Sequence, residues 1–385
     1  MPPPVNSPRR ILLVTLAWAL WIWLLAILAA DLTPWLTGPT KWGYDLVRRV
    51  TPLTRWDSGW YVSIAEGGYM PPPREFGMQT NHAFFPLYPL LMRLLVRTTG
   101  IETSLAGNLI SGAAFLGAVL LFASWVRSRW GEERVRPALL VLLAFPTSFF
   151  FLAVYTEALT LFLVLAAVVA IDRDRPLVAA AAGYLSGLTR ITGVVLGPYL
   201  ALTSLLKSRR DGRSWPRALF AALLTGLPPL LGFLTFCAYF EARFHDPFLF
   251  MRAQHNWGTS EKTALDGPRL IAETVWKDVK SGRILEKSPA RTLEGVFLLL
   301  FAGLAIRLLR EKRWPEALWV VMTIGLVPFT GTLESAGRYV LPAFPAFAAL
   351  AAFSRERLFF GALLAAGFLI QAAYVWVFVN WLWAG

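Results

Sequence analysis

An acidic residue stands among aromatic side chains in segment 54–90, TRWDSGWYVSIAEGGYMPPPREFGMQTNHAFFPLYPL. Asp57 directly follows Trp56, and Tyr61 comes one helical turn later. His82 precedes a stretch of aromatic residues and prolines in the same segment. An ionised carboxylate can accept the proton of an attacking hydroxyl group as a general base. Segment 54–90 is therefore where we first expect catalysis.

Asp57 also has a purely structural interpretation. Thr54 and Asp57 have the spacing of a capping box, in which Asp57 is the third residue of a short helix. Such a helix places Trp56 and Trp60 on one face, at the membrane interface where tryptophan is enriched. Asp57 and Tyr61 then share the neighbouring face, which points towards the protein.

Three further charged residues interrupt or border apolar segments, namely Glu157, Arg190 and Arg338. Glu157 is either an ordinary polar turn residue or a functional one, since a carboxylate at the membrane is costly. Arg190 and Arg338 match the phosphate of a lipid headgroup, because a guanidinium group binds phosphate through paired hydrogen bonds. The alternative for both arginines is a salt bridge to Glu157 or Glu334.

The three histidines of the chain are His82, His245 and His255. Their spacing matches no motif of metal ligands, so we predict no metal site. Segment 245–258 mixes aromatic and polar residues and includes His255 and Trp257. This mixture suits contacts with a sugar or a lipid, and it suits packing at the membrane interface equally well.

The elements that must position these residues are apolar helices. Of the 385 residues, 56% are hydrophobic and 16% are charged. The runs 11–30, 104–126, 218–240 and 358–385 contain no charged residue, and each exceeds the roughly 18 residues that indicate a membrane span. Their hydrophobicity is continuous rather than alternating, so the sequence predicts an all-α polytopic membrane protein.

The net charge of +13 does not indicate a nucleic-acid partner. The basic residues lie in short segments between apolar runs, as the positive-inside bias predicts for cytoplasmic loops. Arg9 and Arg10 then place the N-terminus in the cytoplasm. The single cysteine, Cys237, lies inside an apolar run and cannot form an intrachain disulfide.

Two long segments, 31–83 and 241–291, are predicted to be outer loops that contain interfacial helices. The stretch 84–97 is too short and too rich in arginine to cross the bilayer. We therefore expect an interfacial helix there, from which Arg93 and Arg97 reach the lipid headgroups.

Two apolar stretches predict reversals of the chain. The stretch 137–171 would be about 52 Å long as one helix, against a hydrocarbon core of about 30 Å. We therefore expect a helical hairpin that turns near 155–157. The stretch 177–206 lies between two basic segments and is interrupted by Arg190. We expect two short helices there, which line an outward-facing cavity.

The remaining apolar stretches predict spans at 292–306, 317–333 and 339–353. With the others they make about 11 membrane helices, some of them short or re-entrant. We divide the chain at the second outer loop into a catalytic module, 1–240, and a C-terminal module, 241–385.

At the polar positions the sequence resembles the PIG-V family, which comprises the transferases that add the second mannose of the GPI anchor and their bacterial relatives. The matching pieces are Arg55-Trp56-Asp57 with Tyr61, Ile64-Ala65-Glu66, Gly68-Tyr69, His82-Ala83-Phe84-Phe85-Pro86-Leu87-Tyr88-Pro89-Leu90, Phe145-Pro146-Thr147-Ser148-Phe149-Phe150 with Tyr155-Thr156-Glu157, Leu188-Thr189-Arg190-Ile191-Thr192-Gly193 and Gly337-Arg338-Tyr339-Val340-Leu341. They occur in the order typical of the family and extend over most of the chain. Arginine outnumbers lysine by 30 to 7, which favours a bacterial plasma-membrane protein.

The resemblance implies the GT-C glycosyltransferase fold and a sugar donor linked to polyprenyl phosphate. It also implies that Asp57 is the catalytic base. The residues we expect to contact substrate are Arg55, Trp56, Tyr61, His82, Glu157, Arg190, Arg338, His255 and Trp257. No cofactor is implied beyond the lipid-linked donor, and participation of a divalent metal is left open.

The function expected from the resemblance is transfer of a hexose, with mannose as the first candidate, to a lipid-linked or glycan acceptor. The site would lie on the outer face of the membrane, in contact with membrane lipids. The first alternative is a transporter or a flippase for lipids or glycolipids, which would show repeats or charges at mid-membrane. Further alternatives are a GT-C enzyme with another sugar, such as arabinofuranose or glucose, or with a protein acceptor, and a scaffold without activity.

Overall fold

The computed structural model describes residues 7–32, 52–72, 78–255, 266–280, 289–330, 333 and 335–382. Within these ranges every regular element is a helix. Six helical stretches there are long and apolar enough to cross a membrane. Two shorter apolar helices, α8 (Pro176–Gly187) and α17 (Trp314–Gly325), lie among them. The predicted all-α membrane class is confirmed, whereas the total of about 11 membrane helices stays a prediction.

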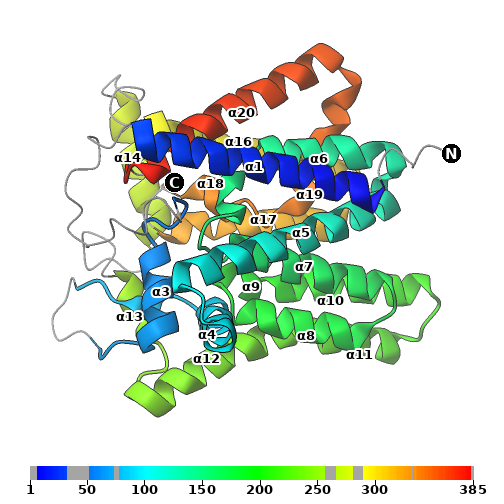
Figure 1. Cartoon of the computed structure of the whole chain (residues 1–385). Coiled ribbons are helices and arrows are strands. Elements are labelled where there is room, and N and C mark those ends of the chain that lie inside the picture. The colour runs from blue at the N-terminus through cyan, green and yellow to red at the C-terminus, as the bar shows by residue number, and fades with distance from the viewer. Residues whose placement is uncertain are drawn as a thin grey trace.

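The long stretches run side by side as a bundle (Figure 1). They are α1 (Pro8–Leu32), α5 (Thr103–Trp130), α9 with α10 (Ile191–Val194 and Leu196–Arg210), α11 with α12 (Trp215–Gly226 and Pro228–Phe244), α16 (Pro289–Arg310) and α20 (Arg357–Val379). α1 packs against both α5 and α20, so the first and last long helices are neighbours. α1 leaves Leu13, Leu20 and Leu24 exposed, as expected of a helix whose outer face meets lipid.

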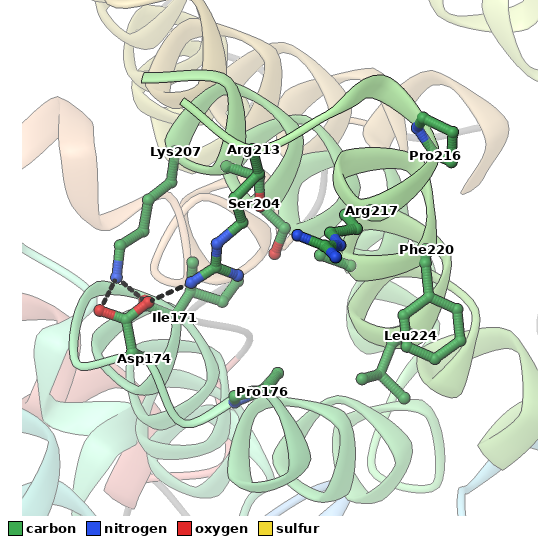
Figure 2. A pocket seen from close by; sticks show the side chains of 12 residues that line it. Ile171, Asp174, Pro176, Ser204, Lys207, Arg213, Pro216, Arg217, Phe220 and Leu224 are labelled. Carbon is green, nitrogen blue, oxygen red and sulfur yellow. Dashed lines mark hydrogen bonds and ion pairs between the residues drawn. The ribbon is translucent and has the colours of Figure 1, made fainter. Parts of the chain in front are cut away.

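The basic turns gather at one end of the bundle. Arg129 pairs with Asp172 at 2.6 Å, and Arg313 donates to the Arg129 carbonyl at 3.0 Å. Lys207 pairs with Asp174 at 2.8 Å in the same region (Figure 2). These contacts join turns that are far apart in the sequence. They confirm the prediction that the basic segments share one side of the bundle.

Short helices lie at the opposite end of the bundle from the N-terminus (Figure 1). They are α3 (Ser58–Gly67), α13 (Leu249–His255) and α14 (Gly267–Lys280), with the short 3₁₀ turn η2 (Asn81–Ala83) beside α3. All four fall within the two segments that the sequence assigned to outer loops. The helical content predicted for those loops is therefore present in the described residues.

The expected interfacial helix 84–97 is present as α4 (Leu87–Thr99), which packs against α3. Arg93, however, does not reach towards lipid headgroups. Its guanidinium group donates to the carbonyls of Ala65 and Ile64, each at 2.7 Å. These carbonyls belong to the last turn of α3, where helix carbonyl groups have few backbone N–H partners; the Ile64 carbonyl also accepts from the Gly68 N–H at 3.0 Å. Arg93 therefore caps α3 and holds it against α4.

The predicted hairpin 137–171 exists, but its turn is longer than expected. α6 (Val135–Ala144) ends before Pro146, and α7 (Glu157–Asp172) begins only at Glu157. Between them lies the 3₁₀ turn η4 (Ser148–Phe151), and every residue from 145 to 156 is buried. Phe145 is extended, as contact with a following proline favours. Irregular backbone of this kind is tolerated at membrane depth where protein surrounds it.

The expected break in the stretch 177–206 is confirmed, since α8 ends at Gly187 and α9 begins at Ile191. The expected single span 339–353 is wrong. In its place are α18 (Ala336–Tyr339), α19 (Phe344–Leu350) and the 3₁₀ turn η7 (Ala351–Arg355). Pro342 and Pro345 explain this difference, because proline lacks the N–H that a continuous helix needs and clashes with the preceding turn.

Candidate active site

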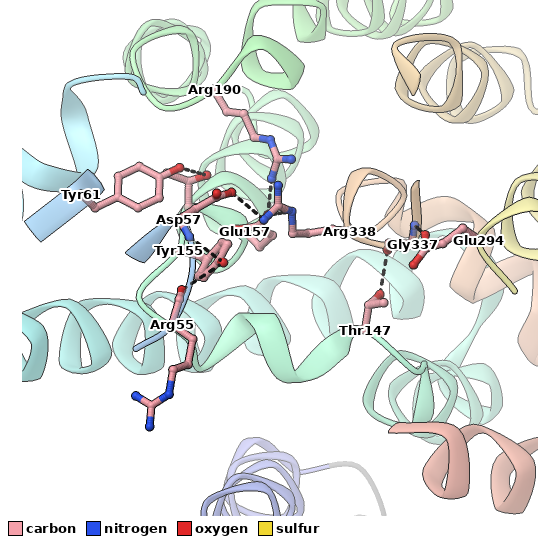
Figure 3. A network of polar contacts seen from close by, with 11 residues as sticks. Arg55, Asp57, Tyr61, Thr147, Tyr155, Glu157, Arg190, Glu294, Gly337 and Arg338 are labelled. Atoms are coloured by element: carbon pink, nitrogen blue, oxygen red, sulfur yellow. Dashed lines mark hydrogen bonds and ion pairs between the residues drawn. The ribbon is translucent and has the colours of Figure 1, made fainter. Parts of the chain in front are cut away.

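Two carboxylates and two guanidinium groups meet beside α3 (Figure 3). Arg338 Nη1 lies 2.8 Å from Asp57 Oδ2, and Arg338 Nε lies 3.3 Å from Glu157 Oε1. Arg190 Nη1 pairs with the same Glu157 oxygen. Charges therefore alternate along the series Asp57, Arg338, Glu157, Arg190, which we call the charged cluster. The salt-bridge alternative for the two arginines is confirmed for Glu157, while Glu334 lies outside the described residues.

Each member of the charged cluster stands at the boundary of a helix. Asp57 immediately precedes α3, and Glu157 is the first residue of α7. Arg190 lies in the break between α8 and α9, and Arg338 lies in α18. Side chains at helix boundaries project into the space where the irregular segments meet. The breaks in the helices thus bring together residues that are far apart in the sequence.

Asp57 does not act in a capping box, so that structural prediction is wrong. α3 begins at Ser58, and Asp57 occupies the N-cap position without a side-chain hydrogen bond to the helix. The Ser58 hydroxyl instead accepts from the Arg55 N–H at 3.2 Å. Trp56 precedes the helix with a φ of 55°, so it does not share a helical face with Trp60. The Asp57 carboxylate is left to turn towards Arg338.

Tyr155 holds the backbone behind Asp57. Its hydroxyl accepts from the Asp57 N–H at 3.2 Å and donates to the Arg55 carbonyl at 3.2 Å. Its ring also lies 5.1 Å from the guanidinium carbon of Arg338, close enough for a cation–π contact. Tyr155 therefore fixes both partners of the pair between Asp57 and Arg338.

Tyr61 lies on the inner face of α3, as expected from its spacing to Asp57. It is buried, and its hydroxyl lies 3.5 Å from the Thr156 Oγ1. Burial raises the pKa of Tyr61 above its ordinary value of 10.0, and the charge of Glu157 raises it further. Tyr61 therefore stays protonated at neutral pH and keeps its hydroxyl as a hydrogen-bond donor.

Accessibility distinguishes the two carboxylates. The Asp57 side chain is 14% exposed, whereas that of Glu157 is 1% exposed. The Oε2 atom of Glu157 is buried and has no hydrogen-bond partner in the described part of the chain. Both carboxylates contact the guanidinium group of Arg338, so Glu157 belongs to the same site as Asp57. A substrate hydroxyl can reach Asp57 far more readily than Glu157.

Glu294 is a buried acid of α16 that we did not select from the sequence. Its carboxylate accepts from the Gly337 N–H and from the Tyr374 hydroxyl, the latter at 3.3 Å. Gly337 directly precedes Arg338, so Glu294 supports the turn that carries this arginine (Figure 3). The sequence does contain an indication of its role, because Glu294 is the one charged residue inside the predicted span 292–306. An acid within a membrane span is energetically costly and therefore suggests a function.

Arg55 and Trp56 lie beside the charged cluster but contact another helix end. Arg55 Nε donates to the Val379 carbonyl at the end of α20, at 3.1 Å. The Trp56 ring lies 5.8 Å from that of Trp381. The Arg55 side chain points away from Asp57 (Figure 3). These two residues anchor the chain before α3, and their expected contact with substrate stays a prediction.

His82 lies outside the charged cluster. Its ring nitrogens contact the Thr80 hydroxyl at 2.9 Å and the Met70 carbonyl at 2.8 Å. Burial lowers the pKa of His82 below its ordinary value of 6.5, so the neutral ring ties two parts of the loop together. His255 ends α13, and Trp257 lies outside the described residues. In the described ranges no three His, Cys, Asp or Glu side chains come together as a cation site.

A family model described as Mannosyltransferase (PIG-V) matches residues 45–247, which is more than half of the chain. The chain belongs to this family. The match includes Asp57, Glu157 and Arg190, whereas Glu294 and Arg338 lie beyond it. The resemblance of the short sequence pieces to the PIG-V family is thereby confirmed. The chain has no match among curated proteins.

Solved structures of two glycosyltransferases are similar to this chain. The Archaeoglobus fulgidus oligosaccharyltransferase tethered to an acceptor peptide has a TM-score of 0.50 at 15% identity, over 96% of this chain and 55% of that one. ArnT from Cupriavidus metallidurans bound to undecaprenyl phosphate has a TM-score of 0.49 at 16% identity, over 94% and 63%. The chain thus spans less than two thirds of either protein. The likeness to the oligosaccharyltransferase shows the GT-C fold.

Proposed function

We propose that this chain is an inverting glycosyltransferase that moves mannose from a polyprenyl-phosphate-linked donor to a lipid-linked or glycan acceptor. In this proposal Asp57 is the general base and the reaction takes place on the outer face of the membrane. The observation that carries the proposal is the contact between the accessible Asp57 carboxylate and the Arg338 guanidinium group. The PIG-V family match supports the reaction class.

The chemistry suits a carboxylate that is ionised and reachable. Asp57 takes the proton of the acceptor hydroxyl while the hydroxyl oxygen attacks the anomeric carbon. The bond between that carbon and the phosphate oxygen breaks, and polyprenyl phosphate leaves with the electron pair. Attack from the face opposite the phosphate inverts the anomeric centre. Glu157, which is 1% exposed, is too enclosed to serve as this base.

Arg338 and Arg190 are the groups that we assign to the phosphate. The leaving phosphate gains negative charge as its bond to the sugar breaks, and fixed guanidinium groups stabilise such charge. A guanidinium group has five N–H donors in a fixed plane, so Arg338 can pair with Asp57 along one edge and face a phosphate with another. The proposal assigns the charge stabilisation to these arginines and uses no cofactor.

The outer location rests on charge distribution. α3 lies at the opposite end of the bundle from the basic turns (Figure 1), and the charged cluster lies beside α3 (Figure 3). The positive-inside bias assigns the basic turns to the cytoplasm. A site on the other side has no access to cytoplasmic nucleotide sugars, which explains the need for a lipid-linked donor. In this proposal the protein lies in the plasma membrane, so membrane lipids surround the site.

The test is transfer by the purified protein in detergent from polyprenyl-phosphate-mannose, followed by release of polyprenyl phosphate. Asp57→Asn preserves the size of the side chain and removes the base, so we expect the rate to fall by about 10²- to 10⁴-fold. The matched control is Glu66→Gln, which neutralises an exposed carboxylate of the same helix, α3. We expect this control to release polyprenyl phosphate at the wild-type rate.

Three other outcomes would count against parts of the proposal. Release by Asp57→Asn at the wild-type rate, together with loss of release in Glu157→Gln, would move the base to Glu157. Faster release of polyprenyl phosphate from a glucose or arabinofuranose donor than from the mannose donor would show that mannose is not the preferred sugar. No release from any of these donors by the wild-type protein would contradict the transferase and favour a transporter or a scaffold.

A further inference from the structure

A pocket of about 650 Å³ lies at the basic end of the bundle, away from the charged cluster. It opens between the ends of α7, α8, α10 and α11 (Figure 2). Its lining combines basic, hydroxyl and apolar side chains, among them Lys207, Arg213, Arg217, Ser204, Phe220 and Leu224. The proposed transfer reaction uses none of these residues, so the pocket needs a separate explanation.

Positive charge exceeds negative charge in this lining. Asp174 is its one acid, and it pairs with Lys207 at 2.8 Å and with Arg213 at 3.2 Å. The hydrogen bond from Lys207 lowers the pKa of Asp174, so this carboxylate is ionised at neutral pH. One anion thus faces three cations, and two positive charges in the lining are left without compensation.

Arg217 carries one of these uncompensated charges. It is exposed, and no hydrogen bond or ion pair joins its side chain to another residue in the part of the chain that the structure describes. Arg213 and Arg217 both extend towards the middle of the pocket (Figure 2). Like charges that face one space repel each other, and an anion between them removes that repulsion. A phosphate group suits this position, since guanidinium binds it through paired hydrogen bonds.

The apolar part of the lining continues from Arg217 along α11. Phe220 and Leu224 follow at the helical spacings i+3 and i+7, which places all three residues on one stripe. Leu224 lies about 10 Å further along the helix axis than Arg217. α11 begins a stretch, Trp215–Phe244, that is long enough to cross a membrane. The stripe therefore changes from charged to apolar in the direction of the membrane interior.

We propose that this pocket binds an anionic phospholipid, with the phosphate between Arg213 and Arg217 and an acyl chain along Phe220 and Leu224. A free phosphate ion would use the arginines but not the apolar stripe. Phe220 is 67% exposed, so it leaves a large ring surface for an acyl chain to cover. Anionic lipids are concentrated in the cytoplasmic leaflet, which is the leaflet that the basic turns would face.

The test is native mass spectrometry of the full chain in detergent, titrated with phosphatidylglycerol and, separately, with phosphatidylcholine. We expect a saturable phosphatidylglycerol site that Arg217→Gln weakens about fivefold, the usual effect of one basic residue at an anionic membrane surface. Phe220→Ala should also weaken it, because the acyl chain loses its apolar contact. The matched control is Arg210→Gln, which removes an exposed arginine of α10 outside the lining. We expect that control to bind like the wild type.

Several results would overturn the proposal. The proposal fails if Arg217→Gln binds phosphatidylglycerol with wild-type affinity. It also fails if Arg210→Gln weakens phosphatidylglycerol binding as much as Arg217→Gln does, because this result would indicate a general basic surface. Equal affinity for phosphatidylcholine would remove the role of the anionic charge. Displacement by millimolar inorganic phosphate, with Phe220→Ala unchanged, would assign the pocket to free phosphate. Thermal unfolding without lipid checks that Arg217→Gln, Phe220→Ala and Arg210→Gln all fold. None of these readouts depends on sugar transfer, so failure of the proposed function would leave this test intact.

Discussion

Gly337 shows how single residues direct the charged cluster. Its N–H donates to Glu294, and its carbonyl accepts from the Thr147 hydroxyl at 2.7 Å. A Cβ at this position would lie 2.8 Å from Thr147 Cγ2, so the neighbouring elements approach too closely for a side chain. With both polar backbone groups in use, the peptide before Arg338 has one orientation. That orientation aims Arg338 at Asp57.

We expect Glu294→Gln to slow sugar transfer about tenfold, because a hydrogen bond to a charged group contributes more than one to a neutral group. Glutamine retains an acceptor for the Gly337 N–H, so the protein should unfold near the wild-type temperature. The effect should fall on kcat more than on KM for the donor, since it acts through the orientation of Arg338. Initial rates over a range of donor concentrations measure both constants.

The matched control for this variant is Glu316→Gln. Glu316 is also a buried acid, and it lies 3.6 Å from Arg129 at the basic end of the bundle. We expect this control to leave the transfer rate unchanged. Wild-type kcat in Glu294→Gln, or an equal decrease in both variants, would show that Glu294 does not position the site.

At the level of elements, two helices near the cluster pack through glycine. A Cβ at Gly232 of α12 would lie 2.1 Å from the Tyr184 carbonyl oxygen of α8. A Cβ at Gly187 of α8 would lie 2.0 Å from the Pro229 carbonyl oxygen of α12. Small residues allow membrane helices to approach this closely. The end of α8 leads directly to Arg190, so this packing positions part of the charged cluster.

We expect Gly232→Ala to lower the free energy of unfolding by about 1–3 kcal/mol, the usual cost of overpacking. The added methyl group must push α12 away from α8, and sugar transfer should fall as Arg190 moves. The matched control is Gly303→Ala on α16, where a Cβ meets no atom within 4 Å. Alanine favours helix over glycine by about 1 kcal/mol, so the control should be neutral or stabilising. Thermal unfolding in detergent measures the stability of both variants. Equal unfolding temperatures of Gly232→Ala and Gly303→Ala would contradict the packing argument.

At the scale of the whole molecule, the two ends of the bundle differ in composition. One end carries the basic turns, and the other carries α3 and α13 (Figure 1). The pocket lined by Arg213 and Arg217 lies at the basic end, and the charged cluster lies beside α3 (Figure 3). Every long apolar stretch lies between these ends. The two proposals therefore place sugar transfer and the binding of anionic lipid at opposite membrane surfaces.

Labelling of intact cells with a membrane-impermeant maleimide tests this orientation. We expect label on Glu66→Cys, an exposed position of α3, and none on Asp211→Cys, an exposed position after α10, until the membrane is opened. The unmodified chain serves as the blank, because its one cysteine, Cys237, is buried. The reverse labelling pattern would place the charged cluster in the cytoplasm, and would contradict the proposed outer site.

Much of this protein follows from local composition. An uncharged run of about 20 residues is long enough to span the membrane and does so as a helix. Polar residues at the ends of such runs are then the first candidates for catalytic or binding residues. For this reason the sequence predicts the membrane class, the long helices, the break at Arg190 and the four members of the charged cluster. The PIG-V resemblance, which rests on short pieces containing the same residues, follows equally from the sequence.

Contacts between distant segments could not be predicted in this way. Asp57 and Arg338 are 281 residues apart in the chain, and no local pattern states that they pair with each other. The same holds for Glu294, which supports Gly337 from another helix, and for the irregular segment 145–156. The hydropathy of a residue describes its interaction with lipid and water. These contacts depend instead on which protein groups surround each residue after lipid and water have been excluded. Those neighbours are defined only once the helices have packed.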